Sequence, residues 1–306
     1  MKYPEFREEL LNVLKNMVPK AVTVRIVQVE KLNSSVRFGI LFDREDMMYS
    51  PTVYLEPFYR SFQRGMSLEK IAEELLSCYE EELNDVPESV ERLQSYESAR
   101  QDVYCKLIHI KENQRLLQDT PHIKFLDFAI VAYFEVSREE MYKGSVLIKD
   151  YYLERWQITE EELLRNALVC TKEKKGVFFR PMSDILCQYI SKEDGDIYEH
   201  ARKCMFVLTN TEKYMGAIMI YYPEVLSQIA LFLKEDFYLL PSSVHEWIII
   251  PVSATAGEDN LLKTVRDINR IAVLEEEVLS DNIYLYTEAT EGEKIRCISD
   301  FCTKNV

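Results

Sequence analysis

Residues 51–82 read PTVYLEPFYRSFQRGMSLEKIAEELLSCYEEE, and the pattern in this stretch organises the interpretation of the whole chain. Thr52 to Leu55 is predicted as a short strand because it is β-branched, aromatic and apolar. Glu56 to Gly65 follows as a short helix with its aromatic residues on one side, and Ser67 to about Glu82 as a longer helix. The predicted order is therefore strand, short helix, long helix.

The same order returns in the middle of the chain. A strand at Phe128–Val136 is followed by a strand at Ser145–Ile148, a short helix at Lys149–Trp156 and a helix from Thr159 to about Val169. Thr159 and the glutamate three residues later form a capping box, which is a start signal for a helix. We interpret the two stretches as copies of one supersecondary unit.

A looser third copy is predicted further along the chain. Met205–Thr209 and Ala217–Tyr221 are interpreted as a hairpin, and Pro223 as the start of a helix. Periodicity predicts further elements: an amphipathic helix from Phe6 to Met17, strands at Val22–Val29, Val36–Phe42, Val103–Ile110, Phe237–Leu240 and Trp247–Val252, helices at Asn113–Gln118 and Asp259–Ile271, and a terminal hairpin of Asn282–Tyr286 with Lys294–Ile298.

These patterns predict a mixed α+β fold, with mostly antiparallel sheets, helices and repeated strand-hairpin-helix units. The length of 306 residues suggests two domains, since domains average about 150 residues. We place an N-terminal α+β half at residues 1–120 and a C-terminal α+β half at residues 121–306, meeting near residues 86–120. A Pro-rich or Ser-rich linker is missing from the sequence, so a single large domain is the alternative.

The composition argues against several classes of protein. Asp and Glu number 52 against 37 Lys and Arg, which gives a formal net charge of -15. Since proteins bind nucleic acid mainly through cations that displace counterions, this charge argues against a nucleic-acid partner. The charged start of the chain and its short apolar runs predict a cytoplasmic location and no membrane partner. The seven cysteines include no Cys-x-x-Cys pair, which favours reduced thiols over a zinc ribbon or a redox pair.

The polar turn Pro241–Glu246 lies between two apolar predicted strands and holds the catalytic candidates Ser242, Ser243, His245 and Glu246. These residue types occur in an activated nucleophile and its orienting partners. However, neighbouring residues of a strand point to opposite faces, so His245 and Glu246 would not naturally share one site. The alternative is a turn in which the hydroxyls cap backbone groups and the imidazole satisfies a buried acceptor.

The sequence patterns for metals and cofactors are incomplete. A zincin helix needs a second histidine four residues after His245, where the chain has Ile249. A site assembled at a distance from His122, His245 and Asp127 stays open as an alternative. The chain has no P-loop, GxGxxG or GxSxG fingerprint and only 8 glycines, so we expect no cofactor and no resident metal. The basic cluster Lys172–Lys175 is interpreted as solvated charge.

Aromatic residues are abundant, with 19 Tyr, 14 Phe and 2 Trp. Tyr54, Tyr59 and Phe62 in the first copy, with Tyr152 and Trp156 in the second, are candidate anchors of a partner-binding surface. Their helical spacing fits a buried core stripe as well. Both interpretations stay open at this point.

Several segments together carry a resemblance to a known family. They are Ser50–Glu56, Lys106–Ile108, Asn113 with Leu116 and Leu117, Pro121–His122, Phe206–Asn210, Gly216–Ala217, Leu240–Glu246 and Val278–Asp281. In combination they resemble an uncharacterised bacterial family, found mostly in Firmicutes and described as a domain of unknown function. The resemblance implies no particular activity and assigns no catalytic residue.

The residues themselves favour a noncatalytic, cytoplasmic protein-interaction module that binds an unknown protein partner. The acidic charge, the aromatic-rich repeated units and the incomplete catalytic signatures support this hypothesis. The alternative is a hydrolase-type enzyme of unrecognised class, centred on His245 with Ser242 or Ser243. An enzyme predicts a pocket that holds the imidazole beside another titratable group, whereas an interaction module predicts an exposed apolar patch.

Overall fold

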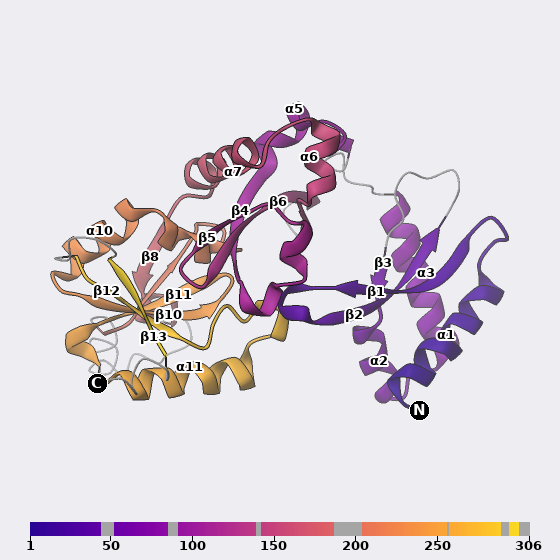
Figure 1. Ribbon diagram of the computed structural model, residues 1–306. Helices are drawn as coiled ribbons and strands as arrows, with labels where there is room; N and C mark the ends of the chain where they lie inside the picture. Colours follow the sequence, from indigo (N-terminus) through magenta and orange to yellow (C-terminus); the bar gives the residue numbers. More distant parts are fainter. Residues whose placement is uncertain are drawn as a thin grey trace. The chain divides into compact units, whose positions relative to one another are not determined.

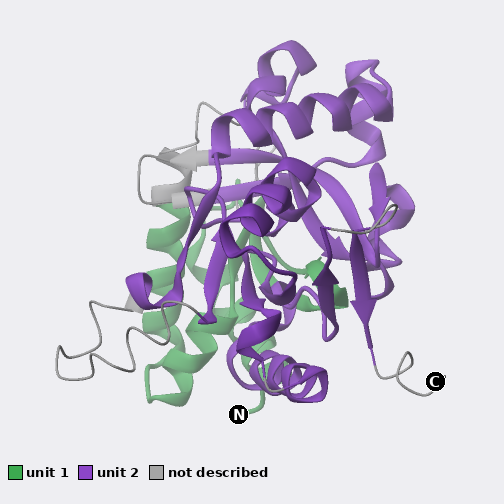
Figure 2. Ribbon diagram, turned by 90° about the vertical axis from the view of Figure 1, so that its left-hand side faces the viewer, with its two compact units in different colours: residues 1–90 green, residues 91–306 purple. Residues whose placement is uncertain are grey.

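The computed structural model describes residues 1–43, 52–84, 91–138, 142–186, 204–255, 257–288 and 294–299. Ser50, Pro51, Cys187 and Cys302 lie outside these ranges. The predicted α+β class with antiparallel sheets is confirmed (Figure 1). The chain forms two compact units, residues 1–90 and residues 91–306, called unit 1 and unit 2 below (Figure 2).

Unit 1 is a three-stranded antiparallel sheet with helices packed against it. Its elements are α1 (Tyr3–Met17), β1 (Thr23–Glu30), η1 (Leu32–Ser34), β2 (Val36–Asp43), β3 (Thr52–Tyr54), α2 (Glu56–Gln63) and α3 (Leu68–Asn84). The helical spacing of Phe6, Leu10 and Leu14 places all three on the buried face of α1, where they are fully buried. They share one core with Phe42 of β2 and Leu75 of α3.

The first sheet of unit 2 is built around one long strand. Its strands are β4 (Val103–His109), β5 (His122–Phe125), β6 (Phe128–Arg138) and β7 (Tyr142–Leu147). β4 pairs along one edge of β6, while β5 and β7 share the other edge, all antiparallel. The accompanying helices are α5 (Tyr96–Ala99), η2 (Arg100–Asp102), η3 (Lys111–Asn113), η4 (Leu116–Asp119), α6 (Asp150–Trp156) and α7 (Glu160–Lys175). α7 packs against β4 and β6.

The second sheet of unit 2 has six strands in the order β13-β12-β10-β11-β9-β8. They are β8 (Phe178–Pro181), β9 (Phe206–Thr209), β10 (Phe237–Ser243), β11 (Glu246–Pro251), β12 (Ile283–Tyr286) and β13 (Ile295–Ile298). Its helices are α8 (Met182–Leu186), η5 (Gly216–Tyr221), α10 (Pro223–Leu233), η6 (Val252–Ala254), α11 (Glu258–Ala272) and η7 (Glu275–Glu277). The rings of Phe128, Trp247 and Tyr284 meet where the two sheets of unit 2 pack together.

The predicted repeat is confirmed for its first two copies. The order strand, strand, short helix, long helix appears as β2, β3, α2 and α3 in unit 1, and as β6, β7, α6 and α7 in unit 2. The predicted cap of α7 is present, because the Thr159 hydroxyl accepts a hydrogen bond from the backbone N–H of Glu162 at 3.2 Å. The terminal hairpin is also confirmed as β12 and β13.

The predicted hairpin of the third copy is wrong. Residues 217–221 belong to the 3-10 helix η5, and β9 pairs with β8 and β11 instead. The backbone of η5 bonds to the β10–β11 turn, where the Ala217 N–H donates to the Val244 carbonyl at 3.3 Å. The approach is close, since a Cβ on Gly216 would lie 2.8 Å from the His245 carbonyl oxygen. Hydrogen bonds within η5 and to this neighbouring turn therefore satisfy backbone N–H and C=O groups that a strand partner would otherwise bind.

The two units divide the chain near residue 90, inside the interval 86–120 where the sequence places the meeting of the two halves. Strand β4 precedes the sequence-based boundary at 120 and 121, yet it pairs with β6 of unit 2 along its whole length. Among the described cysteines, Cys105 and Cys170 are free thiols. Across the described ranges, no helix is both long enough and apolar enough to cross a bilayer.

Candidate functional site

The catalytic candidates lie at the β10–β11 turn, but their side chains point to different partners. The Ser242 hydroxyl donates to Glu246 Oε1 at 3.3 Å. Ser243 Oγ accepts the backbone N–H of His245 at 3.1 Å, which caps the turn as the alternative interpretation expects. Neither of these bonds joins a serine hydroxyl to the imidazole. Ser242 and Ser243 bond to Glu246 and to the backbone here, so their use as a nucleophile with His245 as its base stays a prediction.

The imidazole of His245 connects three loops. Its Nδ1 accepts the backbone N–H of Met215 at 3.0 Å, so we assign the neutral ring's proton to Nε2. Nε2 lies 3.5 Å from Glu277 Oε1, and the ring packs against Tyr214 at a centroid distance of 5.4 Å. Because the Nδ1 lone pair is engaged by a backbone donor, the ring positions the loop that ends at Met215.

The sequence left open a metal site built from His122, His245 and Asp127. In the structure, each of these side chains contacts a different partner. His122 Nδ1 bonds to the Thr120 carbonyl at 2.8 Å, and the Asp127 carboxylate accepts the Tyr284 hydroxyl at 2.8 Å. Within the described ranges, no three His, Cys, Asp or Glu side chains gather closely enough to hold a metal ion. His245 keeps the contacts given above.

The aromatic candidates of the second copy are core residues. Tyr152 is 9% exposed and Trp156 is 8% exposed. The indole N–H of Trp156 donates to the Leu93 carbonyl at 3.0 Å, and the ring packs against Tyr96 and Tyr152. A buried indole with a satisfied N–H holds its own unit together.

The aromatic candidates of the first copy are half-buried. Tyr59 packs against Tyr3 and Phe6, and its hydroxyl donates to the Met1 carbonyl at 3.2 Å. Phe62 also packs on Phe6, with ring centroids 5.2 Å apart. The ring of Tyr54 lies under the Lys31 ammonium at 4.5 Å. These side chains therefore combine core contacts with some exposed surface.

One lysine of the basic cluster is buried, which corrects its interpretation as solvated charge. The Lys175 side chain is 2% exposed, and its Nζ lies 2.7 Å from both Glu135 Oε2 and Glu212 Oε2. It also lies 4.0 Å from the ring centre of Tyr104. Burial, with the neighbouring carboxylates, raises the pKa of Tyr104. The last turn of α7 packs over β4 and β6, which carries Lys175 into this interior.

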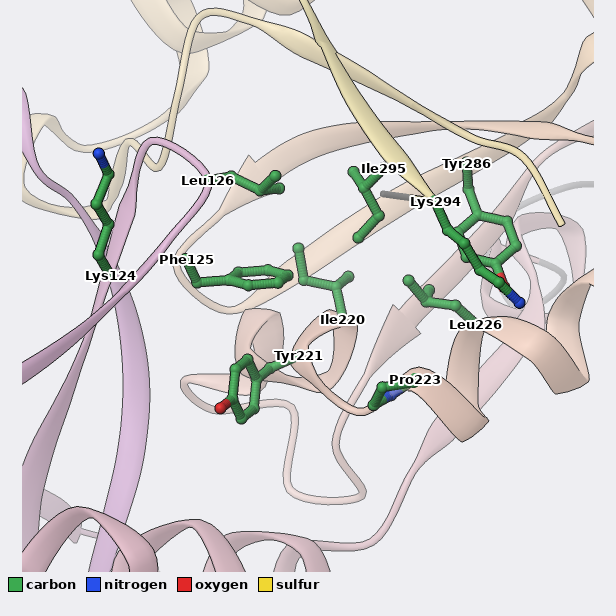
Figure 3. Close-up of a pocket in the computed structure, with 10 residues that line it drawn as sticks. All are labelled: Lys124, Phe125, Leu126, Ile220, Tyr221, Pro223, Leu226, Tyr286, Lys294 and Ile295. Carbon is green, nitrogen blue, oxygen red and sulfur yellow. The ribbon is translucent and has the colours of Figure 1, made fainter. Parts of the chain in front are cut away.

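A pocket beside the β5–β6 turn is the feature that sequence reasoning missed. Its volume is about 460 Å³, and Figure 3 shows the side chains around it. The turn supplies Phe125 and Leu126, η5 supplies Ile220 and Tyr221, α10 supplies Pro223 and Leu226, β12 supplies Tyr286, and β13 supplies Ile295. Two lysines, Lys124 and Lys294, complete the lining. Most of the lining is thus apolar or aromatic.

The β5–β6 turn, which forms one wall of this pocket, is held in place by hydrogen bonds to the Asp127 side chain. Asp127 accepts hydrogen bonds from the Tyr284 hydroxyl at 2.8 Å and from Asn282 Nδ2 at 3.1 Å, and His109 Nε2 lies 3.6 Å away. Burial alone would raise the pKa of the Asp127 carboxyl, but these donors prevail and lower it below its ordinary value. The preceding residue, Leu126, has φ of 56°, which a branched side chain rarely adopts.

The comparison with protein families matches residues 3–288 of the chain to the description "Family of unknown function (DUF5688)". The chain belongs to DUF5688. No curated protein and no solved structure matches the chain.

In this DUF5688 chain, several segments that lie far apart in the sequence meet around the β10–β11 turn. The Thr209 hydroxyl donates to the His245 carbonyl at 2.7 Å, and Gly216 lies against the same carbonyl. The Val244 N–H donates to the Glu277 carbonyl at 2.9 Å, directly before Val278–Asp281. The turn is therefore a packed junction of loops, whereas the pocket draws its residues from β5, η5, α10, β12 and β13.

Proposed function

We propose that this DUF5688 member is a noncatalytic, cytoplasmic protein-interaction module, and that a partner protein binds at the exposed end of α10. The observation that carries the proposal is the exposure of two large apolar side chains there: Leu231 is 75% exposed and Phe232 is 63% exposed. Exposed apolar side chains that gather in a patch are typical of interaction sites.

The exposed ring continues an aromatic cluster of the second sheet. Phe232 lies edge-on to Phe179 of β8 and Phe206 of β9, with centroid distances of 5.7 and 5.8 Å. Phe179 and Phe206 stack at 5.1 Å. Val177, two residues before Phe179, is 45% exposed. We call Val177, Phe179, Leu231 and Phe232 the Phe232 patch.

The strand beside this patch is at the edge of its sheet. β8 pairs with β9 on one side and is the last strand in the order of the described sheet. An edge strand presents backbone N–H and C=O groups to an incoming extended segment. The proposed partner therefore contributes an extended segment whose apolar side chains cover the Phe232 patch. We propose a protein as the partner because a chain with a net charge of -15 repels nucleic acid and anionic lipid surfaces.

The test is a pull-down from the host lysate with the tagged full chain, at low and at moderate salt. The wild type is compared with Phe232→Ser, and with Ile271→Ser as the matched control. Ile271 is 78% exposed on α11, so its substitution removes a comparable amount of exposed apolar surface elsewhere. Circular dichroism checks that both variants keep the fold.

We expect one stoichiometric partner with the wild type and with Ile271→Ser at both salt concentrations. Phe232→Ser should retain about tenfold less of it, since an aromatic anchor contributes about 1.5–3 kcal/mol of apolar burial. If the partner is retained equally by all three proteins, or if none is found, the proposed interaction surface is wrong.

A further inference from the structure

The pocket beside the β5–β6 turn has the dimensions of a small-molecule site. Its volume of about 460 Å³ lies in the range of about 300–1,000 Å³ that ligand pockets occupy. Ile220 and Leu226 are each 1% exposed and Tyr286 is 2% exposed, so part of the pocket wall is shielded from water before a ligand binds. The rings of Phe125 and Tyr221 meet edge to face at 5.3 Å beside them. Such a wall suits a compact apolar body with an aromatic or branched shape.

The wall is held in place before any ligand arrives. Figure 3 shows the Leu126 side chain pointing into the pocket from the β5–β6 turn, opposite Ile220. The backbone there has positive φ, and the anchoring of the next residue, Asp127, to β12 holds it in that conformation. Strain of this kind persists only where the surrounding structure over-determines it, and it gathers at binding sites. A fixed wall lowers the ordering cost of binding.

The charged groups in the lining are both cations. Lys294 is neutralised, because its Nζ lies 2.8 Å from Glu288 Oε1. Lys124 is exposed on β5, and no ion pair joins it to any other residue of the described ranges. Figure 3 places the two ammonium groups at opposite sides of the apolar lining. With Lys294 paired to Glu288, the charge that Lys124 adds to the otherwise apolar lining favours an anionic ligand.

We propose that this pocket binds a small organic anion whose apolar body, aryl or branched acyl, sits among Phe125, Leu126 and Ile220 while its carboxylate pairs with Lys124. The site shares no residue with the Phe232 patch, so the test of this proposal does not depend on the proposed interaction function. A ligand without the anion would keep the apolar contacts and lose the ion pair.

The probes are 4-phenylbutyrate and its uncharged analogue 4-phenylbutanamide, titrated against the full chain by saturation-transfer difference NMR, which detects weak binding. The variants are Leu126→Gly and Lys124→Gln, with Lys111→Gln as the matched control. Lys111 is an exposed lysine of η3 outside the pocket, so its substitution changes the net charge equally. Glycine tolerates the positive φ at position 126, so Leu126→Gly removes the wall while relieving the backbone.

We expect the carboxylate to bind the wild type more tightly than the amide does. Lys124→Gln should weaken carboxylate binding about threefold to fivefold, as for an exposed ion pair, and leave amide binding unchanged. Leu126→Gly should weaken both probes about tenfold, and Lys111→Gln should weaken neither. Equal binding of the two probes, an unchanged affinity in Leu126→Gly, or no binding of either probe to the wild type would overturn the proposal.

Discussion

Asp127 shows how one side chain can hold an unfavourable backbone conformation in place. It follows Leu126, whose φ of 56° is costly for a branched residue. The Asp127 carboxylate is fixed by Tyr284 and Asn282, and its own carbonyl accepts the Ile110 N–H at 3.0 Å. The turn is thus tied both to β12 and to the end of β4.

We predict that Asp127→Asn lowers the free energy of unfolding by about 1.5–3 kcal/mol at pH 7, the contribution of hydrogen bonds to a charged acceptor. Burial opposes the charged form, but the donors around Asp127 lower its pKa in the folded state. Its contribution is therefore complete above the ordinary pKa near 4 and is lost as pH falls through the lower folded value. Urea unfolding between pH 3 and 7 measures the difference between variant and wild type, which should shrink toward acid; a constant difference would contradict the assignment.

Lys175 is a second residue whose role depends on burial. Its ammonium group is enclosed by Glu135, Glu212 and the face of Tyr104. The Glu135 side chain is 10% exposed, so removing the lysine would leave a buried carboxylate without its counter-charge.

We predict that Lys175→Met destabilises the chain by about 3 kcal/mol, because breaking a buried pair from one side is strongly unfavourable. Lys174→Met is the control, since Lys174 is exposed and donates to the Gln101 carbonyl, and this substitution should lower the free energy of unfolding by less than about 1 kcal/mol. Guanidinium unfolding curves give both values. An equal loss of unfolding free energy in the two variants would mean that the ion pairs of Lys175 contribute little to stability.

At the scale of elements, the sequence predicts best where one face of an element is buried. The amphipathic spacing of α1 and the Thr159 cap of α7 are local signals, and both elements form as predicted. The sequence does not predict strands β5 and β8, because neither is a run of β-branched or apolar residues: β5 reads His-Ile-Lys-Phe, and β8 ends in Arg180 and Pro181. The segment 216–221 was apolar enough for a strand, but tertiary contacts with the β10–β11 turn make it a 3-10 helix.

The sites show the same division between local and tertiary information. The polar turn at residues 241–246 is visible in the sequence, yet the orientation of His245 depends on the Met215 N–H, far away in the chain. The pocket brings Leu126 of one sheet next to Ile220 of η5 and Ile295 of β13. A sequence offers no period or motif that joins such distant positions, so only the tertiary structure reveals the site.

At the scale of the whole molecule, each unit encloses its own core. Unit 1 buries Phe6, Leu10 and Leu14 of α1 against its sheet and α3. In unit 2, β4 buries Val103 and Leu107 completely beside β6. A unit with its own core is expected to fold by itself.

We therefore predict that residues 91–306 fold alone, with a cooperative thermal transition and the near-ultraviolet circular dichroism of packed aromatic rings. The matched control is the fragment 121–306, which begins at the sequence-based boundary and lacks β4. Without β4, one edge of β6 and the buried side chains beside it, such as Ile130, lose their cover, so this fragment should show exposed apolar surface and no cooperative transition. A cooperative transition of equal midpoint in both fragments would place the domain boundary at residues 120 and 121 instead.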